Sequence, residues 1–330
     1  MQIIQIKPKE KLTAAEMGKL WATYLGNSMS TCVLNYYLQH VEDKDIKDLL
    51  KNALTLCNEF ILTIEEIFTK ENFPIPDGFT EKDVNIDAPR LFEDDFYVHH
   101  LKYLAKAGMS IYSVGSPLMY RKDVKDFFIY CLDSTNRLME QIKEILMSKG
   151  LIIKPHIIPI PEKVEYVHEN FLNGFFGDVR PLHALEITHL YDNIENNVTS
   201  NAIIMAFAQV VRDSNIRKLF NKGRELTTEN VERYIELLHK NNLPSPSTLD
   251  HLVSNSTFSP FSDKLMLFHK MDMFSMKIRA FGNSVAVNGR HDLAMNYSKS
   301  LIKISSFVED ASKIMIGKGW FQRPPLAKDR

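Results

Sequence analysis

Apolar residues near the start of the chain recur three and four positions apart, at Met17, Leu20, Trp21, Tyr24 and Leu25. This spacing places them on one face of an α-helix. Thr13 precedes the run, and Glu16 lies three residues after Thr13. This pair is a capping-box signature for a helix start. The pattern therefore predicts a long helix over residues 13–41.

The same pattern occurs twice in the chain. With an offset of 170 residues, which becomes 169 after one residue is lost in a loop, four pairs of stretches face each other: LTAAEMGKL (12–20) and LHALEITHL (182–190), NFPIP (72–76) and NLPSP (242–246), FEDDFYVHH (92–100) and FSDKLMLFH (261–269), KGLIIKP (149–155) and KGWFQRP (318–324). A register held with one gap over so many residues indicates internal duplication. The Pro-x-Pro stretch is expected to end the second helix of each repeat.

Each repeat is expected to form four helices. Their predicted ranges are 13–41, 43–71, 93–117 and 121–149, then 182–211, 213–241, 263–287 and 290–318. The predicted fold is all-α, with four-helix bundles at 1–150 and 182–330. Residues 151–181 join them, and this stretch is too apolar for a flexible linker, so we expect an ordered inter-bundle connector.

The connection over residues 72–92 is long for a helical bundle. An extended stretch of this length reaches about 70 Å, whereas a helix of the predicted length spans about 43 Å. The connection can therefore return along the whole bundle, which gives the crossover topology of ferritin-like bundles.

Composition narrows the classes of function. The chain of 330 residues is 45% hydrophobic and 25% charged, with a net charge of −1. It carries no basic excess for nucleic acid and no apolar run long enough to span a membrane. Its first residues lack the apolar core of a signal peptide, so we expect a cytoplasmic protein. Cys32, Cys57 and Cys131 have neither disulfide nor zinc spacing.

Several stretches resemble a protein family of endospore-forming bacteria. They are FSDKLMLFH (261–269), KGWFQRPPLAKDR (318–330), EKVEYVHENFLNGFFGDVRPL (162–182) and the duplicated first helix with its glutamate. The family is a domain of unknown function, and some members are provisionally described as spore coat proteins. The resemblance implies tandem ferritin-like four-helix bundles, coat proteins or further copies of the chain as partners, and a location in the mother cell or spore.

Bundles of this type can bind two metals through glutamates and Glu-x-x-His pairs on facing helices. The candidate ligands of the second repeat are Glu186, His189, Glu236, His239 and Glu309. The first repeat keeps the glutamates only, as Glu16, Glu66 and Glu140. Iron, manganese or zinc would suit such ligands.

A structural interpretation competes with the metal site. A glutamate near a helix start stabilises the helix dipole, so Glu16 and Glu186 are expected to be caps or ion-pair partners. The paired polar positions Asn27/Asn197 and Ser30/Ser200 lie in the middle of the first helix of each repeat and are candidates for hydrogen bonds between helices. His100 and His269 would join the metal layer only in an up-down-up-down bundle.

Three functions follow from these patterns. The first is a structural or interaction protein without catalysis, associated with the spore or its coat. The second is a ferritin-like metal-binding protein. The third is a carrier of an apolar ligand, suggested by the methionine-rich stretch at 266–276.

Overall fold

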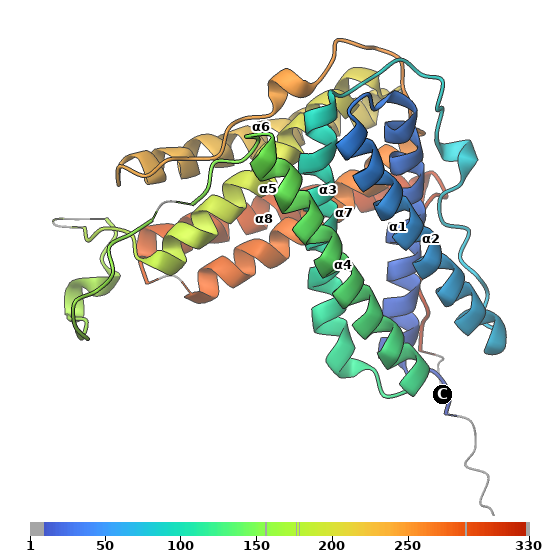
Figure 1. The fold of residues 1–330 in the computed structure, drawn as a ribbon, viewed down its shortest axis with the longest axis horizontal. Coiled ribbons are helices and arrows are strands. Elements are labelled where there is room, and N and C mark those ends of the chain that lie inside the picture. Colours follow the sequence, from blue (N-terminus) through green and yellow to red (C-terminus); the bar gives the residue numbers. More distant parts are fainter. Residues whose placement is uncertain (1–9, 156, 176, 178, 288, 328–330) are drawn as a thin grey trace, which may run out of the picture. The chain divides into compact units, whose positions relative to one another are not determined.

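The computed structural model describes residues 10–327 except 156, 176, 178 and 288. The described residues form α-helices and short 3-10 helices, with no strand beyond isolated bridges (Figure 1). The α-helices are α1 Ala14–His40, α2 Lys44–Lys70, α3 Asp94–Gly115, α4 Lys122–Ser148, α5 Ala184–Val210, α6 Ser214–His239, α7 Asp263–Val287 and α8 His291–Gly317. Every predicted helix occurs within two residues of its predicted ends, which confirms the all-α fold and its duplication.

The helix starts use the predicted capping box. The Thr13 hydroxyl accepts from the Glu16 N–H at 3.2 Å, and the Glu16 carboxylate accepts from the Thr13 N–H at 2.7 Å. In the second repeat, His183 caps α5 in place of the threonine, because its Nδ1 accepts from the Glu186 N–H at 3.3 Å. Both first helices therefore begin with the same reciprocal pair of bonds.

The helix ends explain the repeated Asn-x-Pro-x-Pro stretch. Asn72 and Asn242 take left-handed backbone conformations, with φ of 53° and 56°. Each lets the next N–H turn back to a carbonyl of the last helical turn, from Phe73 to Phe68 and from Leu243 to Leu238. Asparagine tolerates this conformation better than other residues with side chains. The asparagine therefore closes the helix, and the prolines prevent its resumption.

The chain divides into two compact units. Unit 1 contains the described parts of residues 1–86, 101–145 and 322–330, and unit 2 contains residues 87–100 and 146–321. The last residues of the chain thus belong with the first repeat. The start of α3 belongs with the second. The boundaries at 150 and 181 expected from the repeat stay a prediction.

The core of unit 1 is aromatic. Phe60 of α2 contacts Tyr112 of α3 and Phe127 of α4 edge-on, with ring centroids 6.0 Å apart in both pairs. Asn27 of α1 lies near the Tyr112 hydroxyl and donates to the Thr23 carbonyl. These contacts tie α1, α2, α3 and α4 around one core.

Unit 2 shows how the long connection is used. Helix α5 packs against α6 and α7, and α8 packs against the same two helices. Helices α6 and α7 therefore occupy opposite corners, and residues 240–262 cross between them. The connection also carries the bridge between Phe92 and Val253, flanked by hydrogen bonds from Glu93 to Leu252 and from Ser254 to Leu91. This crossover is the topology expected from the connection length.

None of the helices in the described part of the chain is long and apolar enough to span a bilayer.

Candidate functional site

Helix α7 buries two lysines in the core of unit 2. Lys270 and Lys277 are both 0% exposed. Lys270 Nζ donates to the carbonyl oxygen of Ser200 at 2.7 Å and also contacts the Ser200 hydroxyl. Lys277 Nζ donates to Asn197 Oδ1 at 2.9 Å. Asn197 and Ser200, in the middle of α5, therefore accept hydrogen bonds from two lysine amines of α7.

These lysines have no carboxylate partner among the residues that the structure describes. Both amines instead lie over the ring of Phe274, at 4.5 and 4.7 Å from its centroid. Burial lowers the pKa of both lysines well below the ordinary range, and the charge of Lys277 adds to the shift at Lys270. The core of unit 2 thus favours neutral amines.

A histidine pair lies beside this cluster. His100 and His269 occupy equivalent positions of the two repeats, and their Nε2 atoms are 3.0 Å apart within the core of unit 2. One ring donates and the other accepts, so the accepting ring must be neutral. Burial lowers the pKa of His100 to about 3 and that of His269 well below its usual range, which favours the neutral form of both rings. Sequence analysis considered these histidines only as additional metal ligands in an up-down-up-down bundle.

The predicted ligand Glu186 serves the fold. Its buried carboxylate accepts two hydrogen bonds from the Arg180 guanidinium, each 2.8 Å long. It also accepts from the backbone N–H groups of Gly289 and Arg290, at 3.2 and 3.1 Å. Burial alone would raise its pKa, but the bonds from Arg180 and the His183 backbone outweigh burial, and the pKa is lowered.

Glu16 has the equivalent role in unit 1. Its Oε1 accepts from the backbone N–H groups of Tyr120 and Arg121 at 2.9 and 2.8 Å. The other oxygen completes the cap at Thr13. The duplicated glutamate therefore ties the start of each first helix to the turn before the fourth helix. Both glutamates therefore serve as caps, and Glu186 is also an ion-pair partner of Arg180, as the interpretation of caps or ion-pair partners expected.

The other predicted glutamate ligands point into solvent. Each pairs with a lysine one helical turn away: Glu66 with Lys70, Glu140 with Lys143, Glu236 with Lys240 and Glu309 with Lys313. His239 is exposed beside Ser245, and His189 is half-buried. Within the described ranges, no three His, Cys, Asp or Glu side chains converge on one point. The predicted donors are therefore not gathered at one point in the described part of the chain, and the metal site stays a sequence-based prediction.

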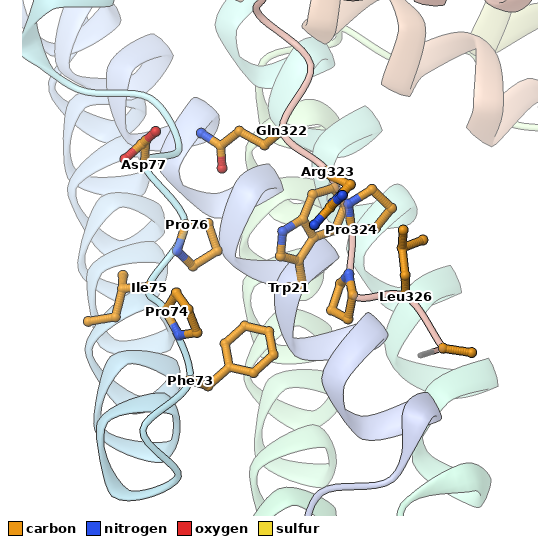
Figure 2. A pocket seen from close by; sticks show the side chains of 12 residues that line it. Trp21, Phe73, Pro74, Ile75, Pro76, Asp77, Gln322, Arg323, Pro324 and Leu326 are labelled. Atoms are coloured by element: carbon orange, nitrogen blue, oxygen red, sulfur yellow. The ribbon is translucent and has the colours of Figure 1, made fainter. Parts of the chain in front are cut away.

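A groove opens on the surface of unit 1 (Figure 2). Its walls are the stretch Phe73–Asp77 and the tail at residues 322–327, and Trp21 of α1 lies between them. The volume of the groove is about 950 Å³. Both walls are rich in proline, and the Trp21 and Phe73 rings are only half-buried. The groove is thus aromatic and apolar, with Asp77 and Arg323 as its charged residues.

The connector between the repeats is the most exposed apolar segment described. Ile157, Ile160, Val164 and Tyr166 are 86–90% exposed, and Val167 is exposed as well. Residues 157–167 contain no helix or strand. Sequence analysis anticipated an ordered, apolar connector but did not anticipate that its side chains would face solvent.

Comparison with known proteins places the chain in a family. The family described as "Protein of unknown function (DUF3231)" matches residues 2–164 and again residues 170–330. The chain belongs to the DUF3231 family. Its two matches are the two repeats seen in the sequence, so the chain is a tandem pair of DUF3231 domains.

One solved structure is similar to part of this DUF3231 chain. It is the crystal structure of a protein from Bacillus halodurans C-125 that is provisionally described as a spore coat protein. The likeness covers 46% of this chain and 98% of that one, with 20% sequence identity and a TM-score of 0.40. No curated protein matches the chain.

Proposed function

We propose that this chain is a non-catalytic structural or interaction protein that works within an assembly, in the spore or its coat. The observation that carries the proposal is the connector at residues 157–167, whose large apolar side chains face solvent. Scattered apolar residues on a surface need no explanation, but a continuous exposed run marks an interaction site.

The backbone of the connector supports the same proposal. Pro155, Pro159 and Pro161 each fix one backbone angle and remove a donor, which favours extended structure over a helix. An extended segment of this kind loses little conformational freedom when a partner binds it. The connector is therefore suited to insertion into the surface of another protein.

The placement of the charged residues agrees with a structural function. Glu16 and Glu186 are engaged in caps, and their oxygens are saturated by backbone and arginine donors. Lys270 and Lys277 are enclosed by the core of unit 2. These four buried titratable groups are thus engaged in folding contacts.

The test compares the wild-type chain with a connector variant in which Ile157, Ile160, Val164, Tyr166 and Val167 are all replaced by serine. Sedimentation velocity would measure self-association, and extraction of spore coats would measure coat association. We expect the wild-type chain to associate and the connector variant to lose association while its helical circular dichroism is retained.

A matched control replaces exposed apolar residues of the helices, Leu62 and Ile302, by serine. This control should associate like the wild type. The proposal fails if the wild-type chain is monomeric and absent from coat extracts, or if the connector variant associates as well as the control.

A further inference from the structure

The groove of unit 1 and the exposed connector belong to the same chain, and each lacks an assigned partner. We propose that the groove receives residues 153–158 from the connector of a second copy of this chain, which links copies head to tail. This inference rests on the proposed function and names the partner of the connector.

The first argument comes from the repeat. The tail that forms one wall of the groove, residues 322–327, is the second-repeat counterpart of residues 153–158 at the offset of 169. Arg323 corresponds to Lys154, and Leu326 corresponds to Ile157. A copy of this segment thus already lies against Trp21, while the first-repeat copy carries Ile157 at 89% exposure.

The second argument comes from the chemistry of the groove. Extended proline-rich segments bind to shallow grooves lined by aromatic rings. The groove presents Trp21 and Phe73 between two proline-containing walls, as Figure 2 shows. Its volume of about 950 Å³ leaves room for a short segment beside the tail. Residues 153–158 supply three isoleucines and one proline, which matches these walls.

The third argument comes from a difference between the repeats. The second-repeat counterparts of Trp21, Phe73 and Pro76 are Tyr191, Leu243 and Pro246, and all three are buried. The equivalent surface of unit 2 is therefore covered. The groove and the connector are different surfaces of the described chain, so the contact joins two unlike surfaces. Such a heterologous contact gives rings or open filaments.

The main experiment mixes two variants of the full-length chain. The groove variant is Trp21→Ala, and the connector variant is Ile157→Asp combined with Ile158→Asp. Each variant alone should sediment as a monomer, because each lacks one of the two surfaces. An equimolar mixture should form heterodimers, because one intact groove meets one intact connector, but it should form no larger species.

A second measurement keeps the test independent of variant folding. The chain has two tryptophans, Trp21 and Trp320. In a Trp320→Phe chain, the fluorescence of Trp21 reports directly on the groove. A synthetic peptide of residues 152–161 should shift this fluorescence in a saturable way. A peptide with serine at both positions 157 and 158 should bind about tenfold more weakly, because it buries less apolar surface.

The outcomes separate this inference from the proposed function. If Trp21→Ala associates like the wild type, or the mixture stays monomeric although both variants are folded, the groove is not the receptor and the inference is wrong. The proposed function would survive that result, provided that the connector variants lose coat association. The inference also fails if the wild-type chain associates with the spore coat but is monomeric and does not bind the peptide.

Discussion

Replacing Lys270 with leucine should stabilise unit 2. Lys270 lies in the core with its amine bound only to Ser200 and the Phe274 ring, and no carboxylate offsets a charge there. The first repeat has Leu101 at the equivalent position, where the side chain is buried. Leucine is therefore compatible with the same place in the fold.

The magnitude follows from the protonation of the amine. In the unfolded chain at pH 7 a lysine with an ordinary pKa near 10.4 is protonated, and holding it neutral in the core costs about 4.6 kcal/mol at most. Leucine removes this cost but loses the two contacts to Ser200, each worth about 1 kcal/mol. The expected net gain at pH 7 is about 2 kcal/mol, or about 4–8 °C in the melting temperature of a unit of this size.

The gain should depend on pH with a defined sign. The folded state holds a neutral Lys270, because burial lowers the pKa, whereas the unfolded chain binds a proton there. Unfolding therefore takes up a proton, and the stability of the wild-type chain rises with pH from the folded pKa up to about 10.4. Each such lysine contributes about 1.4 kcal/mol per pH unit within that window. The advantage of the leucine variant should shrink to about zero near pH 9.

Differential scanning calorimetry at pH 7, 8 and 9 would measure this effect, and hydrogen exchange of α7 peptides would assign the transition to unit 2. The control is Lys299→Leu on the exposed face of α8, which should change stability by no more than about 0.5 kcal/mol. A Lys270→Leu variant that melts below the wild type at pH 7, or that keeps the wild-type pH slope, would refute the account of a neutral buried amine.

Two further predictions concern histidine and glutamate. The pKa of His100 is lowered to about 3, and that of His269 is also lowered. Unfolding therefore takes up two protons below about pH 6.5. The free energy of unfolding should fall with acidification by as much as about 2.7 kcal/mol per pH unit. Urea unfolding of His269→Leu at pH 5 and 7 should show about half that slope, and an unchanged slope would contradict the neutral pair. Glu236→Ala should leave both melting temperature and metal content unchanged, because the side chain is exposed and contacts Lys240. Loss of bound metal in this variant, measured by elemental mass spectrometry, would instead support the predicted metal site.

Much of the fold could be predicted from the sequence because its signals are local. The capping box at Thr13 depends on residues three positions apart, and the stop at Asn72 depends on one left-handed residue before prolines. The repeat then allowed each signal to be checked against its copy. The length of the connection at 72–92 allowed a crossover but did not require it, and the equivalent residues 240–262 cross between α6 and α7.

The candidate sites could not be predicted in the same way, because they depend on which residues meet in space. The Glu-x-x-His spacing places two side chains on one helix face but does not decide whether that face is buried, and Glu236 faces solvent. Lys270 and Lys277 are spaced like Phe274 and the neighbouring methionines on the apolar face of α7, which is a detectable signal. It is weak, since lysine near an apolar face usually reaches solvent with its amine.

The differences between the repeats bear on how an assembly could grow. A duplicated domain that kept two open grooves and two free connector segments could join several neighbours at once and branch. Here the surface around Tyr191 is closed, and the second copy of the connector segment is the tail beside Trp21. One donor and one acceptor remain, and a unit with one of each grows only in line or closes into a ring. The asymmetry of the two repeats is thus the feature that would turn a duplicated domain into an ordered assembly.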